Sequence, residues 1–160
     1  MKNKLVIVIL FVSIFILSAC SGEYIGWKNI EIEEVGNFKI PNAWNYKIEG
    51  NIIYFTQTTD ATENKDDNFV VGAITDGGKG IDSISKYYGE EIKYANLLES
   101  QVFSNNAYVG KSSIFLSGNL CEVITFWLNS VDRSAYFIVF DKDIDYELIK
   151  KIAKSFVMRD

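Results

Sequence analysis

Histidine is absent from all 160 residues of the chain. This absence excludes Ser-His and Cys-His catalysis together with the commonest zinc sites, because each of them needs an imidazole. Arginine occurs only as Arg133 and Arg159, and cysteine only as Cys20 and Cys121. With so few groups suited to catalysis, the chain is predicted not to be an enzyme and to need no cofactor.

The first 19 residues have the parts of an export signal. Lys2 and Lys4 give a basic start, and an apolar run from Leu5 to Leu17 is broken only by Ser13. A basic start, an apolar segment of this length and small residues before the cut are typical of such signals. We therefore expect residues 1–19 to be a signal peptide.

The four residues at the end of this segment, Leu17-Ser18-Ala19-Cys20, resemble the lipobox of bacterial lipoproteins. The resemblance implies that a diacylglycerol is attached to the thiol of Cys20 and that cleavage leaves Cys20 first. An uncleaved membrane helix is the alternative. It is disfavoured because a span needs about 20 apolar residues and Glu23 follows soon after Cys20.

The lipobox-like motif also predicts where the protein works. Burial of two long acyl chains holds a protein firmly on its membrane. We expect the protein to be lipid-anchored on the extracytoplasmic face of the cell membrane, with Cys20 as the lipidation site. Once Cys20 is modified, Cys121 is left without a disulfide partner, so stability must come from the core. Cys121 lies in an apolar strand pattern and is expected to be a buried, unreactive thiol.

The charge of the remaining 141 residues is negative. Loss of Lys2 and Lys4 leaves 14 of the 16 basic residues against 21 acidic ones, a balance of −7. This sign argues against binding to nucleic acid or to anionic lipid through bulk electrostatics. A chain of this length is the usual size of one domain. We assign residues 20–28 to a lipidated N-terminus and tether, and residues 29–160 to a single domain.

Alternating apolar and polar residues predict strands through most of the domain. Tyr24, Ile25 and Trp27, in the tether, are apolar enough to dock on it. The predicted strands lie at residues 30–33, 38–40, 44–48, 52–57, 69–75, 100–117, 120–128 and 135–140. The run 100–117 is expected to be bent or bulged at Gly110.

Two segments have helical periodicity instead. Asp82 is a plausible N-cap for the first helix, and Asp143 or Asp145 for the second. The apolar stripes are formed by Ile81, Ile84, Tyr88, Ile92 and Ala95 in the first, and by Leu148, Ile149, Ile152, Ala153 and Phe156 in the second. Gly89 lies inside the first stripe and should weaken that helix by about 1 kcal/mol.

These patterns predict an α+β fold, with a largely antiparallel twisted sheet of about seven strands packed with two helices. The strand Phe38-Lys39-Ile40-Pro41 with Trp44 after it, and a last helix that ends Lys154-Ser155-Phe156, resemble the PsbP-like fold. The likeness spans Gly36 to Val157. It implies an architecture and no activity, because a fold does not fix function.

Two short motifs carry chemistry in other proteins but lack essential parts here. Gly77-Gly78-Lys79-Gly80 lies where a phosphate loop would sit, yet Ala73 replaces the first glycine and Gly80 the hydroxyl residue. Ser83-Ile84-Ser85-Lys86 matches the Ser-x-x-Lys of penicillin-recognising enzymes, and Ser117-Gly118-Asn119 faintly resembles their second motif. The Lys-Thr-Gly that accompanies Ser-x-x-Lys in those enzymes is also absent. Because each motif lacks essential parts, both are interpreted as structural.

The acids Asp141-x-Asp143-x-Asp145-x-Glu147 begin like a calcium loop. Tyr146 stands where that loop needs glycine, and Ile152 where it needs a bidentate glutamate. Capping of the last helix explains the acids with fewer assumptions, and calcium stays open as an alternative. The acids Asp60, Glu63, Asp66 and Asp67 are interpreted as a solvated loop.

Aromatic residues make up 14% of the chain, and they suit either core packing, which we favour, or a stacking platform for sugar or peptide. Tyr87 and Tyr94 lie off the first helical stripe and are expected to be exposed. The prominent aromatics are Trp27, Trp44, Trp127, Tyr87, Tyr88, Tyr94 and Tyr136.

We therefore expect a lipid-anchored, extracytoplasmic, non-enzymatic domain that binds a protein or cell-envelope partner and no nucleic acid. An accessory solute- or calcium-binding subunit of an envelope system is the alternative. A small hydrolase is a third, which would need two carboxylates brought together by the fold.

Overall fold

The computed structural model describes residues 22–57, 67–76, 80–103 and 106–159. The lipobox-like Leu17-Ser18-Ala19-Cys20, the acids Asp60, Glu63 and Asp66, and residues 77–79 of the glycine-rich motif lie outside the described residues. Within the described ranges, no helix is both long and apolar enough to cross a membrane.

The described chain forms two antiparallel sheets and two helices. The large sheet has seven strands in the order β3-β4-β5-β9-β8-β7-β6, and a small one has the order β1-β2-β10. The strands are β1 Trp27–Ile32, β2 Gly36–Pro41, β3 Asn45–Glu49, β4 Ile52–Thr56, β5 Val70–Thr75, β6 Ile92–Phe103, β7 Ala107–Leu116, β8 Asn119–Asn129, β9 Ser134–Val139 and β10 Val157–Met158. The helices are α2 Gly80–Tyr88 and α3 Tyr146–Lys154. The predicted α+β class and antiparallel seven-stranded sheet are confirmed, and the small sheet is added to them.

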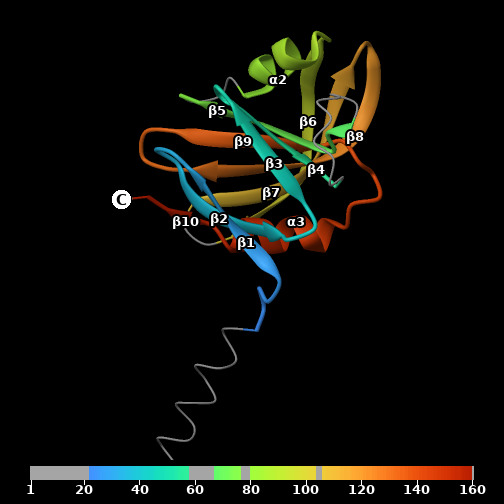
Figure 1. Ribbon diagram of the computed structural model, residues 1–160. Coiled ribbons are helices and arrows are strands. Elements are labelled where there is room, and N and C mark those ends of the chain that lie inside the picture. The colour runs from blue at the N-terminus through green and yellow to red at the C-terminus, as the bar shows by residue number, and fades with distance from the viewer. Residues whose placement is uncertain (1–21, 58–66, 77–79, 104–105, 160) are drawn as a thin grey trace, which may run out of the picture.

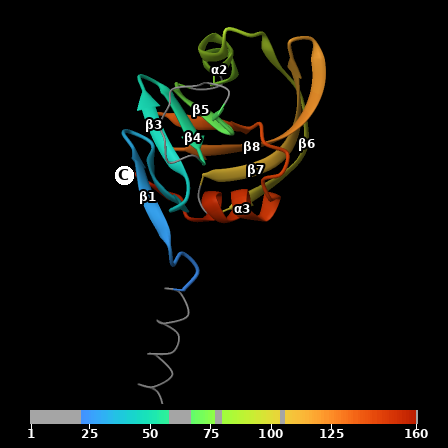
Figure 2. The same cartoon turned by 45° about the vertical axis from the view of Figure 1, so that its right-hand side comes forward.

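The large sheet is covered differently on its two faces (Figures 1 and 2). The small sheet and α3 pack on one face, over a core in which the rings of Phe126 and Phe137 stack 4.3 Å apart. The other face carries α2, whose buried Ile84 packs near Tyr136 and Ile138 of β9. The α2 face is the one that bears the pocket described below.

The helix α3 forms as its sequence predicts. The Oδ1 of Asp145 accepts a hydrogen bond from the backbone N–H of Glu147 at 3.0 Å, which identifies Asp145 as the N-cap. Ile149, Ile152 and Ala153 are fully buried against the sheet. Capping and the apolar stripe therefore account for both the position and the packing of this helix.

The helix α2 is shorter than predicted. It ends at Tyr88, because Gly89 has a φ of 72° and its N–H closes on the carbonyl of Ser85 at 2.9 Å. A glycine in this left-handed conformation is the usual end of a helix. Ile92 and Ala95 belong to β6 and not to the helix, and Asp82 lies inside the first turn and is not the N-cap.

The run 100–117 is two strands and not one bent strand. Residues up to Phe103 end β6, and Ala107 begins β7, which pairs antiparallel with β6. The register shifts in this hairpin fall between Tyr94 and Asn96 and between Leu97 and Glu99, so the irregularities lie in β6 rather than at Gly110. Because apolar residues lie on both sides of the break, the sequence pattern did not show where one strand ends and the next begins.

The first described residues dock on α3. The hydroxyl of Tyr24 donates to the backbone carbonyl of Lys151 at 3.2 Å, and its ring meets that of Trp27 edge-on at 5.3 Å. Trp27 already pairs with Pro41 in β1, so the small sheet begins inside the range 20–28 expected to be a tether. Ile25, in contrast, is 80% exposed and does not dock.

Candidate functional site

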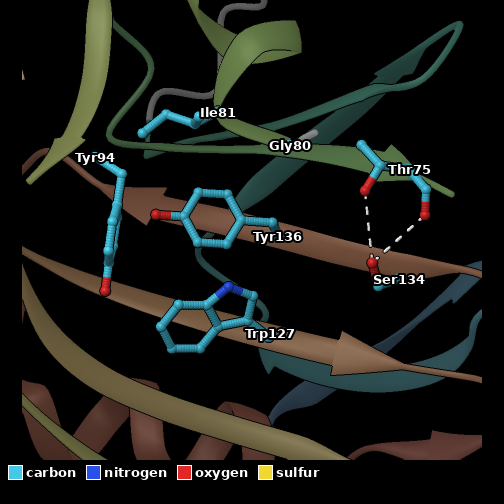
Figure 3. A pocket seen from close by; sticks show the side chains of 7 residues that line it. All are labelled: Thr75, Gly80, Ile81, Tyr94, Trp127, Ser134 and Tyr136. Atoms are coloured by element: carbon cyan, nitrogen blue, oxygen red, sulfur yellow. Dashed lines mark hydrogen bonds between the residues drawn. The ribbon is translucent and has the colours of Figure 1, made fainter. Parts of the chain in front are cut away.

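A pocket of about 260 Å³ opens on the α2 face of the large sheet. Figure 3 shows the side chains that line it, with the Tyr136 ring in the middle. The lining residues are Thr75 of β5, Gly80 and Ile81 of α2, Tyr94 of β6, Trp127 of β8, and Ser134 and Tyr136 of β9.

The pocket exists because α2 covers only part of this face. The helix contacts β4, β5 and β9 and also the edge strand β6, and Figure 2 shows β6 rising beside it. The start of α2 approaches the sheet closely at Gly80, where a Cβ would lie only 2.6 Å from the Cβ of Tyr136. A larger residue at position 80 would push the helix away and widen the pocket.

Tyr136 is the central residue of the site. Its side chain is only 7% exposed, and its hydroxyl has no hydrogen-bond partner among the described residues. Burial raises the pKa of Tyr136 above its ordinary value of 10.0, and the nearby Tyr94 raises it further. The Thr125 hydroxyl lowers this pKa but does not reach bonding geometry. The phenol is therefore neutral at physiological pH, with a proton free to donate.

Aromatic rings form the walls around this hydroxyl. The ring of Trp127 lies 5.4 Å from that of Tyr136 at a tilt of 44°. Tyr94 is 41% exposed and stands on the other side, and the Tyr136 hydroxyl points toward it (Figure 3). The walls therefore offer flat apolar surface to a ligand.

Two further hydroxyls lie at the far end of the pocket. The hydroxyls of Thr75 and Ser134 are 3.5 Å apart, and Ser134 also donates to the Thr75 carbonyl at 3.4 Å. Both distances are long for hydrogen bonds between oxygens. The two hydroxyls thus keep capacity for another partner.

The described lining residues carry no charge. Asp76 and Arg133, which are next in sequence to the lining residues Thr75 and Ser134, form an ion pair at 3.1 Å, and Arg133 also pairs with Glu34 at 2.6 Å. Because no lining residue among those described is a carboxylate, an amine or an imidazole, the lining itself offers no general base. The arrangement is suited to binding a small neutral molecule.

The Ser-x-x-Lys motif has structural roles. The Ser85 hydroxyl donates to the carbonyl of Ile92 and accepts from its N–H, each at 3.0 Å. The Ser83 hydroxyl accepts from the Asn51 side chain at 3.3 Å. Ser85 thereby fixes the turn between α2 and β6, which is the turn that brings Tyr94 to the pocket.

The acids before α3 serve the backbone. Asp141 accepts from the N–H of Asp143 at 2.9 Å, and Asp145 caps α3. Across the part of the chain that the structure describes, no three of the metal-ligating residue types gather closely enough to hold an ion. The capping interpretation is confirmed for Asp145, and calcium binding stays an untested prediction.

Two expectations about single residues are corrected. Cys121 is half-buried rather than buried, and its thiol lies 3.8 Å from the Asn119 carbonyl at the start of β8. Tyr87 is half-buried because its ring stacks on Tyr54 at 5.7 Å and its hydroxyl accepts from Asn68 at 3.3 Å. Tyr94 is exposed, as expected.

Of the aromatics suggested for a stacking platform, three meet in the pocket: Tyr94, Trp127 and Tyr136. Sequence reasoning missed that they converge. The available signal was the strand period, because Trp127 and Tyr136 pair across β8 and β9 and Thr75 pairs with Ser134 across β5 and β9. Such pairs place their side chains on one face of a sheet.

Comparison with known proteins identifies the fold. The chain is similar to the solution structure of cyanobacterial PsbP (CyanoP) from Synechocystis sp. PCC 6803, with 12% identity, 84% of this chain and 93% of that chain covered, and a TM-score of 0.52. A crystal structure from Bacteroides thetaiotaomicron VPI-5482 has 10% identity and a TM-score of 0.47, and its match covers 84% of this chain and 49% of that one. No protein-family model and no curated protein sequence matches the chain. The domain is therefore PsbP-like in fold, as the sequence predicted, and identity this low says nothing further about function.

Proposed function

We propose that this chain is a lipid-anchored, non-enzymatic domain on the extracytoplasmic face of the cell membrane, where it binds a protein or cell-envelope partner. The observation that carries the proposal is the opposite placement of two features. Tyr24 docks on α3, whereas the pocket opens beside α2, and these helices lie on opposite faces of the large sheet (Figure 1).

Chain length supports this arrangement. Tyr24 lies four positions after Cys20, and four extended residues span at most about 14 Å. A lipid on Cys20 would thus hold the α3 side close to the bilayer. The pocket would then face away from the membrane, toward the envelope.

The character of the pocket supports binding over catalysis. Its lining offers aromatic faces and hydroxyls but no charged group among the described residues. It also favours the solute-binding alternative over the calcium-binding one, since hard cations require several charged or carbonyl oxygens.

The anchor is tested in the full chain expressed in a bacterium that processes lipoproteins. Cys20→Ser should prevent lipid addition and release the protein from the membrane fraction. A Cys20→Ser variant that is still processed and still partitions with detergent would contradict the lipoprotein reading.

Orientation is tested with two exposed labelling sites in a Cys121→Ser background. Ile25→Cys lies beside the docked Tyr24, and Lys86→Cys lies on α2. A membrane-impermeant maleimide should label both on intact cells, and a bilayer-embedded quencher should quench a fluorophore at position 25 more than one at position 86. Equal quenching, or labelling only after lysis, would contradict the proposal.

A further inference from the structure

The Tyr136 hydroxyl indicates that the pocket is built for a ligand with a hydrogen-bond acceptor. A buried hydroxyl without a partner destabilises a protein, so it persists in natural folds mainly where something else satisfies it. The Thr125 hydroxyl, which affects the pKa of Tyr136, bonds to the Ser112 hydroxyl at 2.8 Å and does not reach bonding geometry with the phenol. The phenol oxygen is buried and points toward Tyr94, an exposed side chain on β6, so a ligand reaches this oxygen when the Tyr94 ring moves (Figure 3).

The remaining lining residues define the rest of that ligand. The faces of Tyr94 and Trp127 suit a flat surface of C–H groups. The weakly bonded hydroxyls of Thr75 and Ser134 suit a ligand that has several hydroxyls of its own. An aromatic side chain from a peptide would fill the space but leave these hydroxyls and Tyr136 unpaired, which costs affinity.

The charge and the volume of the pocket restrict the class of ligand further. An ionised ligand would meet no counter-charge among the described lining residues, and Arg133, next in sequence to Ser134, is paired with Asp76 and Glu34. The volume of about 260 Å³ falls just below the range of pockets for drug-sized ligands, about 300 Å³ and above. The pocket therefore has room for about one ring.

We propose that the pocket between α2 and β6 binds one neutral saccharide ring of a cell-envelope glycan, an assignment that rests on the function proposed above. The sugar stacks its C–H face on Tyr94 and Trp127. One of its oxygens accepts the proton of the Tyr136 hydroxyl, and its own hydroxyls bond to Thr75 and Ser134.

The test is titration calorimetry on the full-length protein in a detergent that has no sugar headgroup. The probes are chitotriose and cellotriose, which share one linkage and differ in their acetamido groups. At least one should bind with a dissociation constant of millimolar order. Tyr136→Phe should weaken that binding roughly three- to tenfold through loss of one hydrogen bond, and Tyr94→Ala roughly five- to tenfold through loss of the stacking face.

The matched control is Tyr46→Ala, which removes a tyrosine of similar exposure, 44% against 41%, from β3 outside the pocket lining. It should bind like the wild type. Failure of both trisaccharides to bind, or unchanged binding in both pocket variants, would overturn the saccharide assignment.

Two outcomes separate this assignment from the proposed function. If N-acetylphenylalanine amide binds in a Tyr136-dependent manner and neither trisaccharide does, the saccharide class is wrong while partner binding stands. If a trisaccharide binds but positions 25 and 86 are labelled only after lysis, the pocket still binds a saccharide. The ligand then does not come from the cell envelope.

Discussion

The hydroxyl of Tyr24 donates a hydrogen bond of 3.2 Å to the backbone carbonyl of Lys151, 127 residues further along the chain. The ammonium group of Lys151 lies 5.5 Å from the centre of the Tyr24 ring and 5.1 Å from that of Trp27. The ammonium group of Lys39 lies 5.0 Å from the Tyr24 ring. These contacts fasten the first described residues to the last helix, so a lipid on Cys20 would act on α3 through a short, docked segment.

We predict that Tyr24→Ala lowers the free energy of unfolding by about 1–2 kcal/mol, because it removes a hydrogen bond and two cation–π contacts. Tyr24→Phe keeps the ring and should lose less, about 0.5–1 kcal/mol. Urea unfolding of the full chain measures both. A Tyr24→Ala variant as stable as the wild type would show that this docking is too weak to orient the domain.

The packing of α3 is tested at Ile152, which is fully buried against the sheet. Ile152→Asp would bury an unpaired charge, at a cost of several kcal/mol, and should unfold much of the population. Lys154→Asp is the control on the same helix. It replaces an exposed ion pair with Glu23 at 3.3 Å by a repulsion and puts an acid in the last turn of α3, effects worth about 1 kcal/mol each at most. Similar thermal unfolding of the two variants would contradict the packing described here.

The fold could be predicted from sequence wherever one local signal acted alone. The α3 stripe and its Asp145 cap, and the β8 and β9 patterns, gave the right elements. The first helix was overextended because Tyr88 and Ile92 are four residues apart, which fits a helix even though Gly89 ends it between them. The spacing is equally compatible with one helix or with a helix followed by a strand.

The site was harder to predict because it depends on contacts between distant elements. Tyr94, Trp127 and Tyr136 were each notable, but their meeting depends on strand order and on the turn that Ser85 fixes. Nothing local indicates that β9 lies between β5 and β8. Composition could suggest a stacking surface, whereas only the topology shows which rings share it.

A stability measurement on Tyr136 separates a ligand-binding role from a packing role. Tyr136→Phe keeps the ring and removes the unpartnered hydroxyl, so the unliganded protein should gain about 1 kcal/mol of stability. Denaturant unfolding without saccharide checks this. A loss of stability would mean that the hydroxyl has a partner in solution and is not an unsatisfied donor.

The calcium alternative is tested by chelation. Because Asp141 and Asp145 already accept backbone hydrogen bonds, we expect the melting temperature of the full chain to stay unchanged in EDTA. A site occupied at a hundred times its dissociation constant would add about 2.7 kcal/mol. A drop of several degrees, reversed by calcium and abolished by Asp141→Asn with Asp143→Asn, would favour a metal-dependent function instead.

Alkaline pH offers a last, independent check on the buried phenol. Because burial raises the pKa of Tyr136 above 10.0, the folded state holds this proton more tightly than the unfolded state does. The contribution of the protonated Tyr136 to the free energy of unfolding is therefore fully present below about pH 10. It is lost as the pH rises from there toward the folded-state pKa, by at most about 1.4 kcal/mol per pH unit.

The experiment follows urea unfolding of the wild type and of Tyr136→Phe from pH 7 to pH 11. All other ionisable groups are the same in both proteins, so their effects cancel when the free energy of unfolding of the wild type is compared with that of Tyr136→Phe. That difference should be constant up to about pH 9 and then grow in favour of Tyr136→Phe, because only the wild type must keep a proton on a buried phenol. A difference that stays flat through pH 11 would mean that the hydroxyl ionises as freely in the folded protein as in the unfolded chain, which is incompatible with a buried, neutral donor at the centre of the pocket.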